Sequence, residues 1–184
     1  MNTAVVISRW RVRAGYVLAV VVLWFARPTP RSVALGAVIG LAGLALRACA
    51  AGYLRKQDVL TVGGPYAHTR NPLYLGSAIL ALGAAVATRS WVSAAILGAY
   101  FAVVYSVVMR REEEELRGHH GAVFEEYARA VPLFFPKVAA SRIPGADPGA
   151  FSTQQYLKNH EHQAAIGYLL LLVALLILWR WPLH

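Results

Sequence analysis

Two polar clusters interrupt the apolar runs of this chain, and their side chains are of the types that bind a charged ligand. The first is the segment GPYAHTRNPLYLG at residues 64–76, in which Arg70 is followed by Asn71 and Pro72. The second is the acidic run Glu112–Glu115. The guanidinium of Arg70 suits a carboxylate or a phosphate, to which it can donate paired hydrogen bonds. A binding site results if the fold brings the two clusters together.

Asn71 and Pro72 together predict the start of a helix. An Asn side chain here accepts hydrogen bonds from the first free backbone N–H groups, and proline gives up a donor that has no partner at this position. The free N–H groups and partial positive charge of a helix start favour an anion. The same residues also have simpler interpretations. Arg70 can reach lipid headgroups, Asn71 can merely cap the helix, and the glutamates can form a solvated face.

The composition indicates an integral membrane protein. Of the 184 residues, 58% are hydrophobic and only 15% are charged, with a mean hydropathy of +0.48, whereas soluble domains carry about 25% charged residues. The net charge of +9 comes from basic residues spread over membrane-flanking segments, so it does not indicate a nucleic-acid partner. Cys49 is the only cysteine, which excludes an intramolecular disulfide.

Five apolar segments position the two clusters, and the third and fourth of these segments lie between them. Each approaches the roughly 20 residues that a membrane-spanning helix requires. We therefore expect an all-α fold, a polytopic helical bundle with about five transmembrane helices that forms a single membrane domain over residues 1–184. The expected spans are Val12–Ala26, Ser32–Leu54, Pro72–Thr88, Trp91–Met109 and Ala164–Trp181.

The distribution of Lys and Arg predicts the orientation of these spans. Most of these residues fall on one side when the N-terminus is placed inside, and cytoplasmic loops are enriched in them. The N-terminus and both polar clusters are then cytoplasmic, and the C-terminus lies on the opposite side. A tight hairpin at Arg89 and Ser90 returns Glu112 and Glu113 to the face that holds Arg70.

A further helix is expected to continue from the fourth span over Arg110–Tyr127. Gly118 and Gly121 are its weak points because glycine lowers helix propensity. Pro132 and Pro136 end the helical run. The apolar stripe of this helix is expected to consist of Leu116, Val123, Phe124 and Tyr127.

The order of these features resembles that of a known family. RNPLYLG, an apolar hairpin, EE and then LRGHHGAVFEEYARAVPLFFP are similar to the motifs of isoprenylcysteine carboxyl methyltransferases and the related phospholipid N-methyltransferases. The resemblance covers about residues 47–136, and a linker and an extra transmembrane helix at 137–184 lie outside it. Asn71, His120 and Phe124 stand where the family usually has His, Phe and Tyr. Because Asn is neither an acid nor a base near neutral pH, no acid–base role is expected at position 71.

This resemblance implies a methyltransferase that uses S-adenosylmethionine from the cytoplasm and a lipophilic or membrane-embedded acceptor, with a carboxylate as the first choice. It implies that Arg70 and the helix start bind the methionine carboxylate of the cofactor, and that Arg70 and Glu113 are the residues central to catalysis. The glutamates would hold its ammonium or ribose hydroxyls. The implied cofactor-binding residues are Tyr66, Arg70, Asn71, Pro72, Tyr74, Leu75, Gly76, Glu112 and Glu113.

Three other residues are expected on the acceptor side: Arg47, Tyr53 and Tyr127. A charge within a membrane span is costly and usually has a task. Arg47 is therefore expected to contact an anionic substrate headgroup or Glu112, unless it only extends its side chain to the membrane surface.

Other classes of function stay open. Sterol reductases resemble the same helical fold, so a membrane reductase using NADPH is one alternative, although only Arg70 and Lys56 lie nearby for the extra phosphates. A non-catalytic lipid-binding or scaffolding protein is another, and its polar clusters need not converge. The histidines at 119–120 and 160–162 give no closed ligand set, so no metal is expected. A prenylated cysteine, an isoprenoid acid, a phospholipid amine and a thiol all remain possible acceptors.

Overall fold

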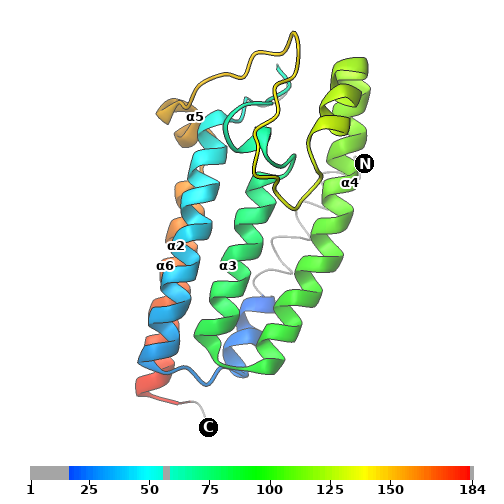
Figure 1. Ribbon diagram of the computed structural model, residues 1–184. Coiled ribbons are helices and arrows are strands. Elements are labelled where there is room, and N and C mark those ends of the chain that lie inside the picture. Colours follow the sequence, from blue (N-terminus) through cyan, green and yellow to red (C-terminus); the bar gives the residue numbers. More distant parts are fainter. Residues whose placement is uncertain (1–16, 56–58, 183–184) are drawn as a thin grey trace, which may run out of the picture.

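The protein is a bundle of helices standing side by side. The computed structural model describes residues 17–55 and 59–182, and every regular element in these ranges is helical. The long helices are α2 (Pro30–Tyr53), α4 (Trp91–Ala130) and α6 (His162–Arg180), and α3 (Pro72–Thr88) is shorter (Figure 1). The 3₁₀ turn η1 (Gly64–Ala67) and the short helix α5 (Thr153–Lys158) lie at one end of the bundle.

Helices α2, α4 and α6 are long and apolar enough to cross a membrane, and α3 is apolar but has only 17 residues. The expected helical membrane bundle is thus confirmed. Residues 12–16 of the first expected span lie outside the described residues, and residues 17–24 of it are helical. Which end of the bundle faces the cytoplasm stays a prediction.

The ends of the helices follow local sequence signals. Helix α2 begins at Pro30 rather than at Ser32, because Thr29 caps it. The Thr29 hydroxyl accepts a hydrogen bond from the Ser32 backbone N at 3.2 Å, and Ser32 Oγ accepts one from the Thr29 N at 2.9 Å. Helix α3 has the expected limits at both ends. Arg89 closes the expected hairpin with a left-handed φ of 51°.

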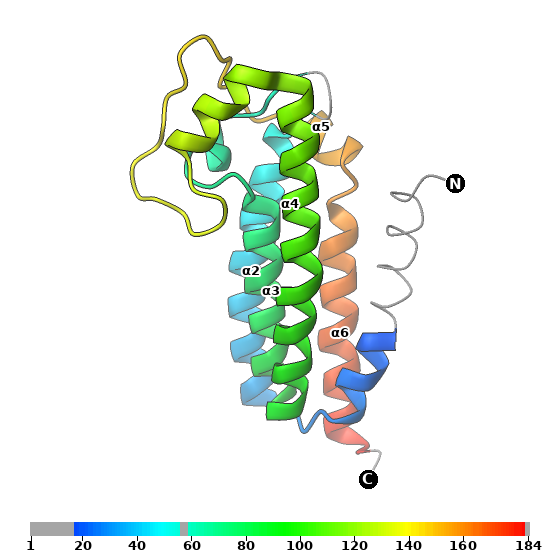
Figure 2. The same cartoon turned by 90° about the vertical axis from the view of Figure 1, so that its right-hand side faces the viewer.

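Helix α4 extends beyond the bundle and bends at Gly121. The φ of 50° at this residue lies outside the helical region and favours glycine. Figure 2 shows the part after the bend turned across the end of the bundle. The helix expected over Arg110–Tyr127 is therefore confirmed, with a break at one of its two glycines.

The apolar stripe expected for this extension is only half right. Phe124 and Tyr127 are 1% and 2% exposed and pack into a small core, whereas Leu116 and Val123 are exposed. After the bend, the helix buries only the face that carries Phe124 and Tyr127, and Val123 lies off that face. Leu116 precedes the bend and lies outside this core. The other core residues are Leu60, Val62, Val131 and Ile143.

Small residues allow α2, α3 and α6 to approach closely, as is typical of membrane helices. A Cβ atom on Gly36 of α2 would lie 2.5 Å from the carbonyl oxygen of Gly83 on α3. The Tyr168 hydroxyl of α6 donates to the carbonyl oxygen of Gly36 at 2.8 Å. Helix α6 is therefore held on the same packed unit as α2 and α3.

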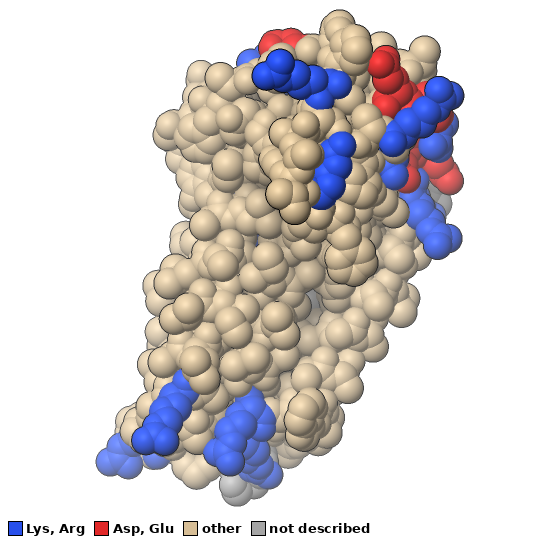
Figure 3. All heavy atoms as spheres, viewed as in Figure 1, with Lys and Arg blue, Asp and Glu red and all other residues tan. Residues whose placement is uncertain are grey.

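On the face shown in Figure 3, charged side chains gather at the two ends of the molecule and leave a broad uncharged belt between them. Large apolar side chains of the belt are exposed, among them Leu35, Val38, Leu41, Val103 and Leu169. A soluble protein rarely exposes so large an apolar surface, whereas the hydrocarbon core of a bilayer requires one.

Candidate functional site

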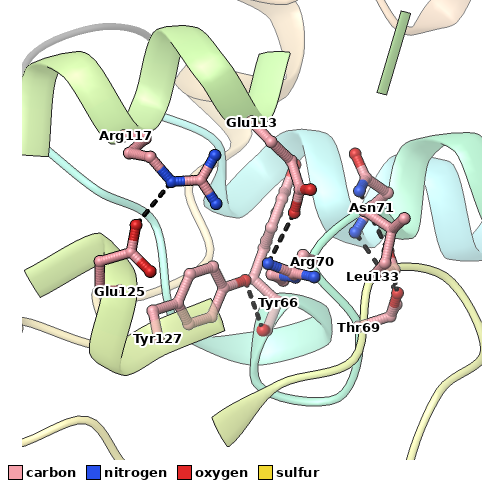
Figure 4. Close-up of polar contacts among 9 residues, drawn as sticks. All are labelled: Tyr66, Thr69, Arg70, Asn71, Glu113, Arg117, Glu125, Tyr127 and Leu133. Carbon is pink, nitrogen blue, oxygen red and sulfur yellow. Dashed lines mark hydrogen bonds and ion pairs between the residues drawn. The ribbon is translucent and has the colours of Figure 1, made fainter. Parts of the chain in front are cut away.

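The two polar clusters converge at the end of the bundle where α4 bends. Arg70 Nη1 lies 2.6 Å from Glu113 Oε1, and the two side chains are 14% and 18% exposed (Figure 4). A second link is made one turn away, where the Tyr74 hydroxyl donates to Glu112 Oε1 at 2.5 Å. The start of α3 and the extension of α4 are thus joined by side chains from both clusters.

The Arg70–Glu113 pair retains unused hydrogen-bonding capacity. Arg70 Nε is buried and has no hydrogen-bond partner among the described residues. Glu113 Oε1 is also buried and lies within ion-pair distance of Arg70. The angles of this contact do not make a hydrogen bond, and no other described residue donates one to Glu113 Oε1. Buried polar groups are normally satisfied. The pair therefore contains one donor and one acceptor for which the described residues provide no hydrogen bond.

Asn71 does not cap α3, so that part of the sequence interpretation is wrong. No hydrogen bond joins its side chain to the first N–H groups of the helix. Its Nδ2 instead donates to the carbonyl oxygen of Leu133 at 3.0 Å (Figure 4). The carbonyl lies beside the start of α3 and is a partner that a local pattern could not reveal.

The segment after Pro132 forms a wall of the site that sequence reasoning missed. It was expected only to end a helical run, yet it lies along residues 67–71 through backbone and side-chain hydrogen bonds. These run from Arg70 N to Pro132 O (2.9 Å), Lys137 N to His68 O (3.1 Å), Ser141 N to Ala67 O (2.9 Å) and Thr69 Oγ1 to Phe134 O (2.9 Å). No signal beyond the two prolines pointed to this pairing.

Tyr66 and Tyr127 form the buried floor beneath Arg70. The Tyr127 hydroxyl donates to the Tyr66 carbonyl oxygen at 2.8 Å (Figure 4). Burial raises the pKa of both phenols well above the ordinary value of 10.0, because an apolar surrounding disfavours the phenolate. The phenols of both residues therefore stay protonated to a higher pH than an exposed tyrosine does. The contacts of Tyr127 are structural, and its expected role toward an acceptor stays a prediction.

Arg47 is bound within the bundle by groups from two other helices. Its Nε forms an ion pair with Glu161, the residue that precedes α6, and its Nη1 donates to Ser77 Oγ and to the Leu73 carbonyl oxygen. Glu161 is 8% exposed. Sequence reasoning did not consider this partner. The signal was present, since Glu161 is the last acidic residue of the chain and stands directly before an apolar run.

The remaining predicted residues pack around these groups. The ring of Tyr53 lies against Gly64, where a Cβ atom would approach it to 2.6 Å. Gly76 faces α2, since its Cβ would lie 2.5 Å from Cγ of Arg47. Pro72 is buried, and Leu75 is half-buried on α3.

An aromatic row that sequence reasoning also missed lies beside Tyr74. The ring centroid of Tyr105 is 5.1 Å from that of Tyr74 and 4.5 Å from that of Phe101, and Phe101 is 6.0 Å from Phe134. The row connects α3, α4 and the segment after Pro132. It gives the site an apolar border.

A family model described as phospholipid methyltransferase matches residues 10–122, which is more than half of the chain. This chain belongs to the phospholipid methyltransferase family. The matched region contains Arg70 and Glu113 and ends before the segment that follows Pro132. The description of this family refers to methyl transfer. Helix α6 lies outside the matched region.

This chain is also similar to two proteins whose names refer to metal resistance. It is 34% identical over 144 residues to the cobalt-zinc-cadmium resistance protein CzcN of Cupriavidus metallidurans, covering 74% of this chain and 66% of that protein. It is 38% identical over 88 residues to the nickel-cobalt-cadmium resistance protein NccN of Alcaligenes xylosoxydans xylosoxydans, covering 48% and 41%. The matches therefore span less than two thirds of either relative. No solved structure matches the chain.

In residues 17–55 and 59–182, no group of three or more His, Cys, Asp or Glu side chains is placed to hold a metal ion.

Proposed function

We propose that this membrane protein transfers a methyl group from S-adenosylmethionine to a carboxylate on a lipophilic acceptor. The observation that carries the proposal is the Arg70–Glu113 pair, which joins the two motifs at 2.6 Å and leaves Arg70 Nε buried and unpartnered within the described residues. Membership of the phospholipid methyltransferase family supports the reaction class.

The charges of the pair fit the amino-acid part of this cofactor. That part carries one carboxylate and one ammonium group. Arg70 Nε is a free donor for the carboxylate, and Glu113 is the neighbouring acceptor for the ammonium. Charge-assisted hydrogen bonds of both kinds are stronger than neutral ones, and more so at partly buried positions. Glu112, which accepts a hydrogen bond from Tyr74, would bind the ribose hydroxyls.

The proposed chemistry makes few demands on acid–base groups. The cofactor supplies a methyl group on a sulfonium, and transfer to a carboxylate oxygen breaks one C–S bond and forms one O–C bond without loss of a proton. The chain then needs only to align the reactants and exclude water. Asn71 in place of histidine is compatible with this reaction, since no acid–base group is required at that position.

Cofactor binding is tested by isothermal titration calorimetry with S-adenosylhomocysteine on purified protein in detergent. Arg70→Ala and Glu113→Ala are each expected to weaken binding roughly tenfold or more, the value of a hydrogen bond to a charged group. Arg117→Ala is the matched control, since Arg117 lies on the same helix as Glu113 but is 48% exposed and pairs with Glu125. Unchanged affinity in Arg70→Ala contradicts the assignment. Binding of NADPH instead would favour a reductase.

The acceptor class is tested with methyl-labelled S-adenosylmethionine and membranes that contain the protein. A methyl ester releases labelled methanol in alkali, whereas a methyl group on nitrogen or on a thioether sulfur stays attached. We expect alkali-labile label in the lipid fraction, and none with Arg70→Ala. Alkali-stable label would support methyl transfer but contradict a carboxylate as the acceptor.

We further propose that this activity contributes to tolerance of transition metals, because both relatives are named for resistance to cobalt and cadmium. Expression in a metal-sensitive bacterial host is expected to raise the cadmium concentration that permits growth. Arg117→Ala should protect as the wild type does, and Arg70→Ala should not. If Arg70→Ala protects as well as the wild type does, metal tolerance does not depend on the methyl-transfer site.

A further inference from the structure

A second site of a different kind lies at the end of the bundle opposite to Arg70. A cavity of about 280 Å³ opens there between the chain that enters α2, the α3–α4 hairpin and the last turn of α6. Its charged lining residues are Arg27 and Arg89, and its apolar lining residues include Leu23, Leu178 and Trp179. The cavity has room for about nine waters at ~30 Å³ each, which is the size of a polar headgroup rather than of an acyl chain.

The fold holds the two arginines in place from adjacent segments. The backbone N of Arg27 donates to the Thr88 carbonyl oxygen at 2.8 Å, so residue 27 is tied to the residue before Arg89. Just below, Ser32 Oγ donates to the Ala87 carbonyl oxygen at 3.0 Å. Thr88 is fully buried. The cavity therefore sits on a packed base rather than on a loose loop.

The charge at this end is not neutralised within the described part of the chain. Its arginines are Arg27, Arg31, Arg89 and Arg180, and none takes part in the ion pairs formed between described residues. The described acidic residues all lie in the extension of α4, at Asp147 or at Glu161. On the face in Figure 3, acidic side chains accordingly appear only at the end where α4 bends. The excess of positive charge attracts anions to this end.

The surroundings of the cavity place it at the level of lipid headgroups. Exposed Trp24, Trp91, Trp179 and Trp181 ring this end of the bundle, and tryptophans concentrate at the boundary between bilayer and water. The anion available in quantity at that level is the phosphate of a phospholipid. Guanidinium groups match phosphate oxygens in a bidentate manner, and apolar walls suit the glycerol end of the lipid.

We propose that this cavity binds the phosphate of an anionic phospholipid, which acts as a structural lipid. Because it lies at the opposite end from Arg70 and Glu113, the bound lipid is not the methyl acceptor, and the site does not depend on the proposed function. Arg27 and Arg89 provide the charge, and Leu23 and Leu178 contact the apolar part of the lipid.

Native mass spectrometry of the purified protein, with phosphatidylglycerol or phosphatidylcholine added, tests this site. The wild type is expected to retain phosphatidylglycerol in preference to phosphatidylcholine. Arg27→Gln and Arg89→Asn should each lower that retention roughly tenfold, as expected for loss of a charge-assisted hydrogen bond. Asparagine is chosen at position 89 because its φ of 51° is left-handed, a conformation that Asn tolerates. Arg31→Gln is the matched control, since Arg31 lies at the same end but outside the cavity.

Three results would overturn the proposal. An equal loss with Arg31→Gln would show attraction to general surface charge. Displacement of the lipid by inorganic phosphate at equal concentration would show a simple anion site. Absence of any preference for phosphatidylglycerol in the wild type would show no site. If a variant fails to fold, the wild type is crosslinked with photoactivatable phosphatidylglycerol instead. The proposal requires the crosslinks to map to the peptides that contain Arg89 and Trp179, and crosslinks elsewhere would contradict it.

Discussion

The ion pair between Arg47 and Glu161 yields the sharpest prediction of stability. Glu161 precedes α6, and its partner Arg47 lies on α2 and also donates to Ser77 and Leu73 on α3. The guanidinium of Arg47 thus links three helices, and Glu161 supplies its countercharge. Replacing Glu161 with alanine leaves the guanidinium of Arg47 inside the bundle without a countercharge.

The expected cost follows from burial. Removing one member of a buried ion pair costs about 3–5 kcal/mol of unfolding free energy. Arg47 is 20% exposed and keeps its Ser77 and Leu73 acceptors, so we expect about 3 kcal/mol, the lower end of that range. Glu161→Gln keeps an oxygen acceptor and loses only the charge, so it should cost about 1–2 kcal/mol.

The measurement is reversible unfolding by sodium dodecyl sulfate in mixed micelles, followed by helical circular dichroism. Asp147→Ala is the matched control, because the Arg55–Asp147 pair is 41% and 63% exposed at a distance of 3.3 Å. Exposed pairs of this kind contribute about 0–1 kcal/mol. The double variant Arg47→Met with Glu161→Met should be more stable than Glu161→Ala alone, since it leaves no unpaired charge.

Two outcomes would refute this reasoning. Equal, small effects of Glu161→Ala and Asp147→Ala would mean that the Arg47 site is as well solvated as the surface. A double variant less stable than Glu161→Ala would mean that the cost comes from lost packing rather than from the uncompensated charge.

Two further predictions concern packing and pH. Gly83→Ala should destabilise the protein by about 1–3 kcal/mol through overpacking, because its Cβ would lie 2.4 Å from Tyr168 Oη. Gly98→Ala, whose Cβ would meet nothing within 4 Å, should stabilise the protein by about 1 kcal/mol through helix propensity. Equal effects of the two variants in the same unfolding assay would refute the close helix contact. Burial raises the pKa of Tyr127 above its ordinary value of 10.0, so above that pH the unfolded phenol ionises while the folded one stays neutral. The free energy of unfolding should therefore fall with rising pH by up to about 1.4 kcal/mol per pH unit for this proton, and Tyr127→Phe should show a shallower slope; identical slopes would contradict the raised pKa.

Local patterns were sufficient for much of the fold. The limits of α3 follow from Pro72 at one end and the Arg89–Ser90 turn at the other. The break in α4 falls at one of the two glycines that weaken its pattern. These features depend on backbone freedom and on the length of apolar runs, which are properties of consecutive residues. They could therefore be predicted without knowledge of the neighbours.

The meeting of Arg70 with Glu113 could also be predicted, but through topology rather than local pattern. One tight hairpin between two helices returns the chain to its starting face, which places the end of the fourth span beside the start of the third. The 2.6 Å contact agrees with that expectation. The chemical roles of the two residues rest on the resemblance and on the proposed experiments.

Only the tertiary structure decided which partners the polar groups take. The amide of Asn71 binds the carbonyl oxygen of Leu133 rather than its own helix, and Arg47 binds Glu161 from the far end of the chain. A polar group buried in a membrane protein takes whichever partner the packing of distant segments brings within hydrogen-bond distance, because an unpaired group there is costly. The sequence by itself therefore determined the helices and the end of the bundle at which the two polar clusters meet. The folded chain determined the contacts that build the site, since these join residues that no local spacing relates.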